Sequence, residues 1–127
     1  MKALSIRQPW ADAILLHGKD IENRTWSTTY RGPLLIHAAK MPDRDDAYEF
    51  IARATGQFSE NSIPMAEHFG GIIGIVDLVD VVTTSKSPWF TLAGCGFGWV
   101  LKNPRRLPFH RVRGQLGLFD VPHFSAT

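Results

Sequence analysis

The stretch Gly71–Val82 constrains the fold of this chain more than any other. It is apolar on both faces of an extended strand except at Asp77 and Asp80. A strand of this composition must be covered on both sides, so we expect it at the centre of the sheet. Gly74 within it predicts a bulge or the close approach of another segment, which a small barrel needs in order to bend.

The remaining segments supply partners for this strand. Further strands are expected within residues 2–7, 18–26, 34–39, 97–101 and 114–121. A first helix begins at Pro9, whose ring suits the first helical position, and stops at Gly18. A second helix opens at Met41-Pro42-Asp43, and residues 55–69 are expected to form a loop with about one helical turn. About five strands and two helices predict a small, mostly antiparallel β-barrel with helices at its ends.

Length and composition predict one domain and narrow the function classes. The chain has 127 residues, enough for one sizeable core. Its formal charge is only +2, so any attraction for nucleic acid must come from local clusters. A single cysteine excludes an intramolecular disulfide, and the five histidines lack a ligand spacing, so we expect no metal and no cofactor. Without a long apolar segment, the chain is expected to be cytoplasmic and to stay out of membranes.

The stretch 18–26, Gly-Lys-Asp-Ile-Glu-Asn-Arg-Thr-Trp, carries the most unusual set of side chains. Read with the period of a strand, it places Glu22, Arg24 and Trp26 on one face, with Lys19 just upstream. Such a face can hold a planar, polar, anionic ligand, because the indole can stack on a ring, the guanidinium can donate two parallel hydrogen bonds and the carboxylate can accept hydrogen bonds. The alternative is an exposed Glu-Arg pair beside an ordinary core tryptophan.

A basic cluster lies near the end of the chain. Lys102, Arg105, Arg106, Arg111 and Arg113 occur without an intervening acid. The cluster predicts either a contact with a nucleic-acid backbone or a solvated face. Two acids of the central strand, Asp77 and Asp80, are expected to pair with Arg24 or Lys19, or to act as catalytic acids.

Three motifs together resemble one known family. They are Leu-Ser-Ile-Arg-Gln-Pro-Trp-Ala from residue 4, Gly-Lys-x-x-Glu-x-Arg from residue 18, and Tyr-Arg-Gly-Pro-Leu-Leu-Ile-His-Ala-Ala-Lys from residue 30. This pattern is similar to the ASCH domain, the module named for its homology to the transcription coactivator ASC-1. The resemblance implies that residues 1–127 form a single ASCH domain of α+β class, a PUA-like β-barrel of about five to six strands with flanking helices.

The resemblance also implies a cleft between the first helix and the barrel that binds RNA or another nucleic acid. Carried onto the matching positions, the residues of this cleft are Ser5, Gln8, Trp10, Lys19, Glu22, Arg24 and His37, with Lys40 at its mouth. With the resemblance added, the ligand-binding interpretation of the 18–26 face is favoured. The predicted nucleic-acid-binding set further includes Trp26, Arg31, Arg105, Arg106, Arg111 and Arg113.

Two other function classes stay open. Some members of the wider family resemble amidohydrolases of N4-acylated cytidine, and others resemble ribonucleases. For either hydrolase, Lys19 and Glu22 are the candidate catalytic groups, although Glu22 stands where the amidohydrolase pattern has a threonine. A partner-binding module using an exposed aromatic loop at Trp89 and Phe90 is the third possibility. The sequence predicts neither the modified nucleoside nor the oligomeric state.

Overall fold

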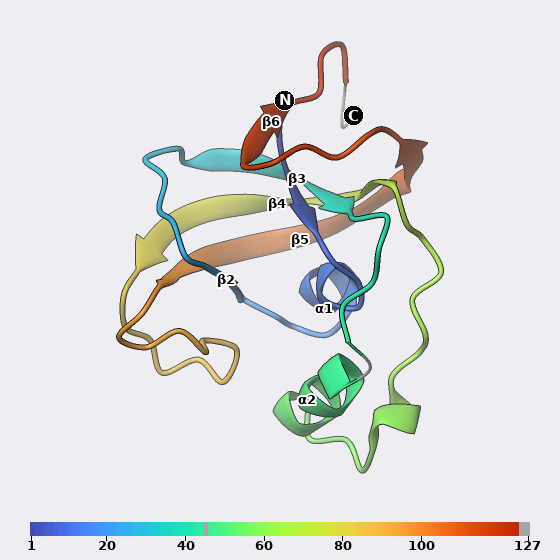
Figure 1. Ribbon diagram of the computed structural model, residues 1–127, viewed down its shortest axis with the longest axis vertical. Coiled ribbons are helices and arrows are strands. Elements are labelled where there is room, and N and C mark those ends of the chain that lie inside the picture. The colour runs from blue at the N-terminus through green and yellow to red at the C-terminus, as the bar shows by residue number, and fades with distance from the viewer. Residues whose placement is uncertain (45, 125–127) are drawn as a thin grey trace.

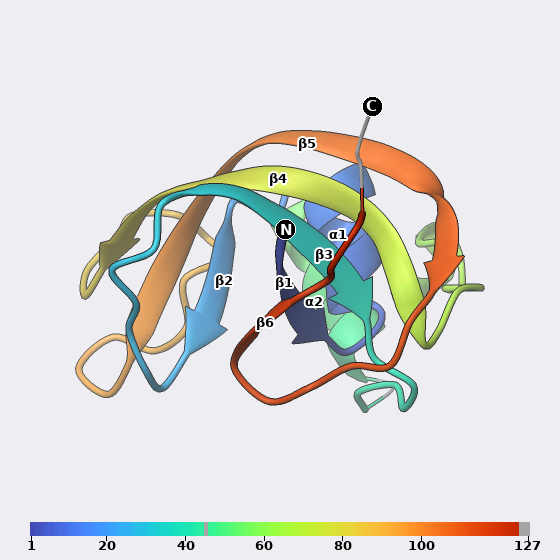
Figure 2. The same ribbon diagram turned by 90° about the horizontal axis from the view of Figure 1, so that it is seen from above.

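A computed structural model of the protein describes residues 1–44 and 46–124. One six-stranded sheet organises it, in the order β2-β5-β4-β3-β1-β6. The strands are β1 (Lys2–Ile6), β2 (Ile21–Arg24), β3 (Gly32–Ala38), β4 (Gly71–Val82), β5 (Phe97–Arg111) and β6 (Leu118–Asp120). β1 and β3 run parallel, whereas the other neighbouring pairs are antiparallel. The strands lie side by side in this sheet (Figure 1), and the view from above shows that the sheet curls into a half-barrel (Figure 2), which confirms the predicted α+β, PUA-like fold.

The helices lie on the concave side of the curled sheet. Figure 2 shows β3, β4 and β5 arching over α1 (Trp10–Leu16). The second helix, α2 (Asp46–Ala54), packs beyond α1, and the short 3-10 helix η1 (Glu60–Ser62) is the single turn predicted in the 55–69 loop. No described helix is long and apolar enough to cross a membrane.

The second helix begins later than the sequence predicted. Residues 41–44 precede it without helical structure. The Asp43 amide donates to the Gln8 carbonyl at 2.8 Å, and the Asp43 carboxylate accepts the Trp10 indole N–H at 2.7 Å. These bonds hold the segment against the start of α1. The start of α2 is therefore decided by a tertiary contact that helix signals do not contain.

The core confirms that the central strand is covered on both faces. On the concave side, Val76 and Leu78 pack with Leu4 of β1 and Ile14 of α1. On the opposite side, Ile72 and Ile75 pack with residues of β1, β3 and the 118–121 segment: Ala3, Leu35, Phe119 and Val121. Burial of this apolar surface supplies the main stabilising term of the fold.

Gly74 has the close backbone contact that the sequence predicted. The pairing of β4 with β5 shifts register between Ile72 and Gly74. A Cβ atom at position 74 would lie 2.5 Å from Leu15 Cδ1 and 2.7 Å from the Arg105 carbonyl oxygen. Glycine therefore permits α1 to approach the bent centre of the sheet.

β5 is much longer than the predicted strand 97–101. It continues through the basic segment to Arg111 and pairs with β4 along that length. β2 pairs only with its first part, from Phe97 to Val100. Pro104 and Pro108 are tolerated because the edge beyond Val100 has no pairing strand among the described residues. The sequence interpretation treats Lys102 to Arg113 as a basic segment and predicts no strand there.

Candidate functional site

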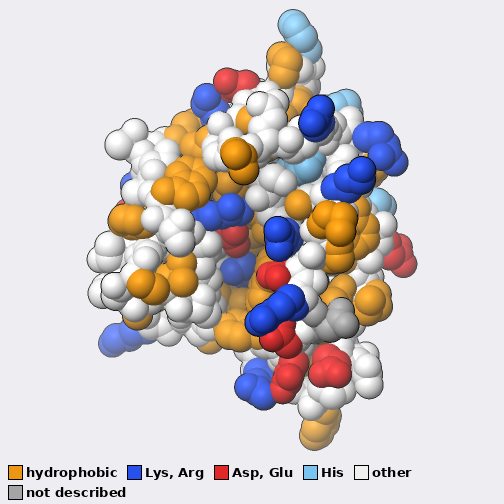
Figure 3. Space-filling model, viewed as in Figure 1, with side chains coloured by type: hydrophobic (Ala, Val, Ile, Leu, Met, Phe, Trp, Pro, Cys, Tyr) orange, Lys and Arg blue, Asp and Glu red, His pale blue; other side chains and the backbone are white. Residues whose placement is uncertain are grey.

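A large open cavity lies beside β2 and the start of α1. Its volume is about 1480 Å³. Its walls come from the ends of β1 and β3, from β2, from residues within 39–44, 46–47 and 111–117, and from the loop that carries Trp89. Figure 3 shows this hollow, along which Lys and Arg side chains alternate with Asp and Glu. β2 pairs with the first residues of β5, and segment 111–117 continues from the last residue of β5, so the curvature of the sheet brings both to one cavity.

Lys19, Glu22 and Arg24 form a connected row of charges in the cavity wall. The Lys19 Nζ atom lies 3.6 Å from Glu22 Oε1, and the Arg24 Nη2 atom lies 2.9 Å from Glu22 Oε2. Arg24 also donates to the Ser5 carbonyl at 2.9 Å, which ties β2 to β1. Its Nε–H is buried without an acceptor within residues 1–44 and 46–124. A buried, unused donor of this kind favours an acceptor supplied by a ligand or water.

Lys19 is an unusual buried ammonium, only 4% exposed. Its Nζ lies 5.3 Å from the centre of the Trp10 ring and 5.8 Å from that of Trp89, within range for cation–π attraction. It also donates to the Ile21 carbonyl. Burial lowers the pKa of Lys19 from its ordinary 10.5, and the neighbouring Glu22 carboxylate opposes that shift.

Ser5 and His37 form a second pair across the paired strands β1 and β3. The Ser5 Oγ and His37 Nδ1 atoms are 2.9 Å apart, and His37 Nε2 donates to the Val112 carbonyl at 2.7 Å. Because a carbonyl only accepts, the neutral ring carries its proton on Nε2 and accepts the Ser5 hydroxyl at Nδ1. Burial lowers the pKa of His37, which favours this neutral form. A Cβ at Gly114 would lie 2.8 Å from His37 Cε1, so segment 112–117 rests directly on the pair.

The structure reveals two positioning residues that the sequence interpretation missed. The Asn23 amide donates to the Trp89 carbonyl at 2.8 Å and accepts the Thr91 amide at 2.9 Å. Asp20 accepts the Ser87 hydroxyl at 2.6 Å. Both side chains thereby hold the loop whose Trp89 backs Lys19. The sequence carries no signal for these contacts, because the partners are more than sixty positions away.

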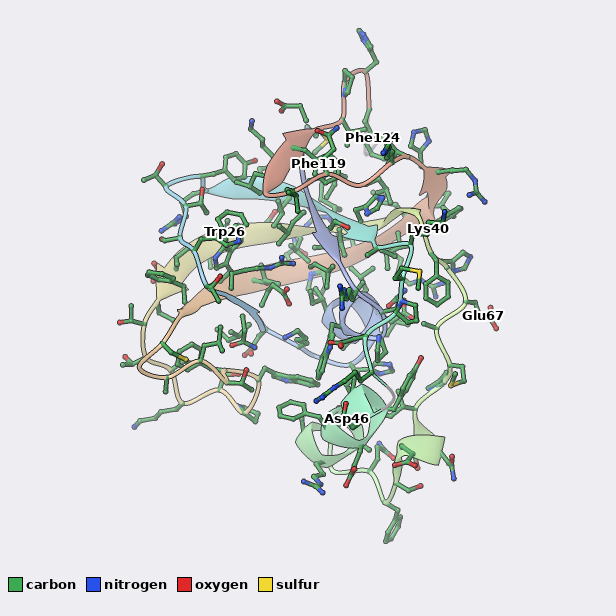
Figure 4. The ribbon with its side chains drawn as sticks, in the orientation of Figure 1. Trp26, Lys40, Asp46, Glu67, Phe119 and Phe124 are labelled. Carbon is green, nitrogen blue, oxygen red and sulfur yellow. The ribbon has the colours of Figure 1, made fainter. Side chains whose placement is uncertain are left out.

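Charge differs between the two ends of the cavity. Ala38, Gly71 and Arg111 are aligned across β3, β4 and β5, so Lys40, Arg111 and Arg113 gather at one end of the sheet. Asp43 and Asp46 line the wall near α2. Figure 4 shows Lys40 beside the end of β3 and Asp46 well apart from it on α2.

Comparison with known proteins identifies the family of this chain. The family model described as ASCH domain matches residues 4–109, most of the chain. This chain belongs to the ASCH domain family. It is similar to the protein named Activating signal cointegrator 1 from Homo sapiens, at 34% identity over 89 residues, and from Mus musculus, at 33% over 89 residues. Each alignment covers 65% of this chain but only 15% of the relative.

The cavity of this ASCH domain brings together most of the predicted site residues. Its walls include Ser5, Trp10, Lys19, Glu22, Arg24, His37, Lys40, Arg111 and Arg113. Their role in binding stays a prediction. Among the described parts of the chain, no group of three His, Cys, Asp or Glu side chains is arranged to hold a metal ion.

Gln8 and Trp26 lie outside the cavity lining of the ASCH domain. Gln8 is fully buried, accepts the Asp12 amide at 2.9 Å and donates to the Asp12 carboxylate at 2.8 Å, which secures the first turn of α1. Trp26 packs edge-on against Trp99, with ring centres 4.8 Å apart. Both therefore have structural contacts in place of cavity contacts.

Three predicted arginines also lie away from the cavity. Arg105 and Arg106 are on the exposed part of β5, and Arg31 is in the loop before β3. Arg31 lies 3.9 Å from Asp80, and Arg105 lies 3.4 Å from Asp77. The prediction that these acids pair with Arg24 or Lys19 is therefore wrong, because Glu22 occupies the position between those two cations.

The aromatic loop of the ASCH domain does not form the exposed patch that a partner-binding module requires. Trp89 is only 4% exposed, and Phe90 is partly buried against the same cluster. Trp89 packs with Ala13, Ile21 and Ile51. The loop contributes its aromatic side chains to the core behind Lys19, which removes the observation on which that function rested.

Proposed function

We propose that this ASCH domain binds single-stranded RNA in the cavity. The proposal rests on one observation above all: Lys40, Arg111 and Arg113 line one end of the cavity and form no ion pair with any described residue. Unpaired cations at an open cavity are suited to phosphates, whose counterions they displace. The resemblance to nucleic-acid-binding members of the family supports the same ligand class.

The rest of the cavity offers groups suited to a base. Trp10 and Phe50 are partly exposed aromatic side chains in its lining. Aromatic rings bind unpaired bases by stacking, whereas bases inside a duplex are not accessible to them. Arg24 adds a guanidinium with its unused Nε–H. Single-stranded RNA fits this combination better than a duplex does.

Fluorescence anisotropy with labelled single-stranded RNA tests the proposal. The variant Arg111→Ala/Arg113→Ala removes two unpaired cavity cations, whereas Arg105→Ala/Arg106→Ala removes two arginines of β5 that lie outside the cavity lining. We expect the first variant to reduce affinity about tenfold or more. The slope of the logarithm of the binding constant against the logarithm of the salt concentration should become shallower by about 1.4, which is about 0.7 for each lost phosphate contact. The control is expected to bind about as the unmodified protein does. Equal losses in both variants would place binding on the outer face of β5 and overturn the proposal.

A hydrolase acting on RNA or on an N4-acylated nucleoside is the second candidate, supported by the lowered pKa of Lys19 beside Glu22. A buried amine of lowered pKa is suited to general-base or nucleophilic chemistry. Incubation with a panel of acylated nucleosides and labelled RNA, with product measured by chromatography, tests this candidate. Turnover that persists unchanged in Lys19→Met would exclude the mechanism.

A further inference from the structure

The two ends of the cavity differ in how their charges are balanced. At the end formed by β3 and β5, the cations are Lys40, Arg111 and Arg113, without acids paired to them in the described chain. In Figure 3 this part of the surface shows several blue side chains, and most of the red ones gather nearer α2. The excess positive charge that attracts a phosphate group therefore lies at this end of the cavity.

At the end near α2, carboxylates balance the cations. The Arg44 guanidinium lies 3.1 Å from Asp46, so its charge is already matched. Burial alone would raise the pKa of Asp43, but hydrogen bonds from the Arg44 amide and the Trp10 indole, together with the charges of Arg7 and Arg44, hold that pKa below its ordinary value. Asp43 is thus ionised at neutral pH. A phosphate arriving here would meet Asp43 and Asp46 with their charges balanced by Arg7 and Arg44, so it would gain little attraction.

The same end is the aromatic one. The Trp10 and Phe50 rings meet edge-on, with ring centres 5.6 Å apart. The ring centres of Phe50 and Trp89 are 6.0 Å apart. The Trp10 indole N–H is held by Asp43, which fixes the ring in the cavity wall. This end can accept a planar base, but it is not suited to a second phosphate attached beyond the bound nucleoside.

We propose that the cavity receives the terminal nucleoside of an RNA strand, with its base at the Trp10–Phe50 wall and its single connecting phosphate at Lys40, Arg111 and Arg113. This inference rests on the proposed function, because it concerns the same cavity and ligand class. A strand that passed through the cavity would carry a phosphate toward Asp43 and Asp46, whereas a strand that ends there does not. The bound end therefore bears a free hydroxyl, which belongs to either the 3′ or the 5′ terminus.

Binding of linear and circular RNA of identical sequence and length tests the inference. We expect circularisation to weaken binding about tenfold or more, since it removes the terminus. Linear strands with a phosphate added at the 3′ or at the 5′ terminus then identify the inserted end. A phosphate at that end is expected to weaken binding about fivefold, the size of one exposed charge interaction, and a phosphate at the other end to have no such effect.

Two matched variants test the role of the carboxylates. Asp46 and Glu49 both lie in the first turn of α2 and both pair with an arginine, but only Asp46 lines the cavity. Asp46→Asn is expected to reduce the penalty of the terminal phosphate, and Glu49→Gln to leave it unchanged.

Each outcome of these experiments has a definite meaning. Equal binding of linear and circular RNA would overturn the inference while the proposed function stands, and absence of binding to either RNA would overturn both. A terminal-phosphate penalty that is missing, or that Asp46→Asn leaves intact, would overturn the charge mechanism argued here.

Discussion

Replacement of Glu22 by glutamine should destabilise the protein far more than the loss of an ordinary ion pair. The exchange keeps the shape of the side chain but removes the negative charge between Lys19 and Arg24. At 3.6 Å and an effective dielectric constant of about 20, the attraction between Lys19 and Glu22 is about 5 kcal/mol. Arg24 is partly exposed and keeps its hydrogen bond to the Ser5 carbonyl, so Lys19 is the cation whose charge is left without compensation. Breaking a buried pair costs about 3–5 kcal/mol, and we expect Glu22→Gln to lower the free energy of unfolding by that amount.

Urea unfolding at neutral pH, followed by tryptophan fluorescence, measures this loss. The matched control is Asp120→Asn, which breaks the exposed pair with Lys2 at 3.2 Å and is expected to cost less than about 0.5 kcal/mol. In the double variant Lys19→Met/Glu22→Gln the buried charge is gone, so most of the lost stability should return. A loss below about 1 kcal/mol in Glu22→Gln, or no recovery in the double variant, would refute the argument that Glu22 compensates a buried Lys19 charge.

Three further outcomes follow from the fold and the site. Gly74→Ala is expected to lower the free energy of unfolding by about 1–3 kcal/mol, because its Cβ would overlap Leu15; thermal or urea unfolding measures this loss. Asn23→Ala leaves the Trp89 carbonyl without its side-chain donor and should cost about 1–3 kcal/mol, with a red shift of tryptophan emission; an unchanged emission maximum would argue against the tether. Burial lowers the pKa of His37 from 6.5, so below that pH the unfolded chain binds more protons than the folded protein and stability falls. Urea unfolding should therefore show a larger fall in the free energy of unfolding from pH 7 to pH 5 in the unmodified protein than in His37→Gln. Equal falls would contradict the expected direction.

Local patterns explain which parts of the fold the sequence predicted well. The central strand β4 was predicted with the boundaries that the structure has, because a run apolar on both faces is buried wherever it lies. The first helix was nearly as clear, since proline and glycine mark its ends. The length of β5 and the start of α2 escaped prediction, because a long pairing with β4 and the bonds of Asp43 decide them.

The candidate site divides in the same way. The 18–26 motif drew attention to Lys19, Glu22 and Arg24 from residue type and spacing alone, and these side chains do line one cavity. The motif was equally compatible with Trp26 at the site, yet the sheet turns that side chain toward Trp99. Strand periodicity assigns faces only while a strand continues, and β2 ends at Arg24.

By itself, the sequence determined the chemistry available to this protein: its strand-forming core, its motif of alternating charges and its family. Only the tertiary structure decided how that chemistry is arranged. Lys40 and Arg111 come to the same end of the cavity through the register of three strands, and Asn23 holds a loop far away in the chain. Residue type and short-range spacing are local properties, whereas burial, charge pairing and the polarity of the cavity depend on which distant segments meet.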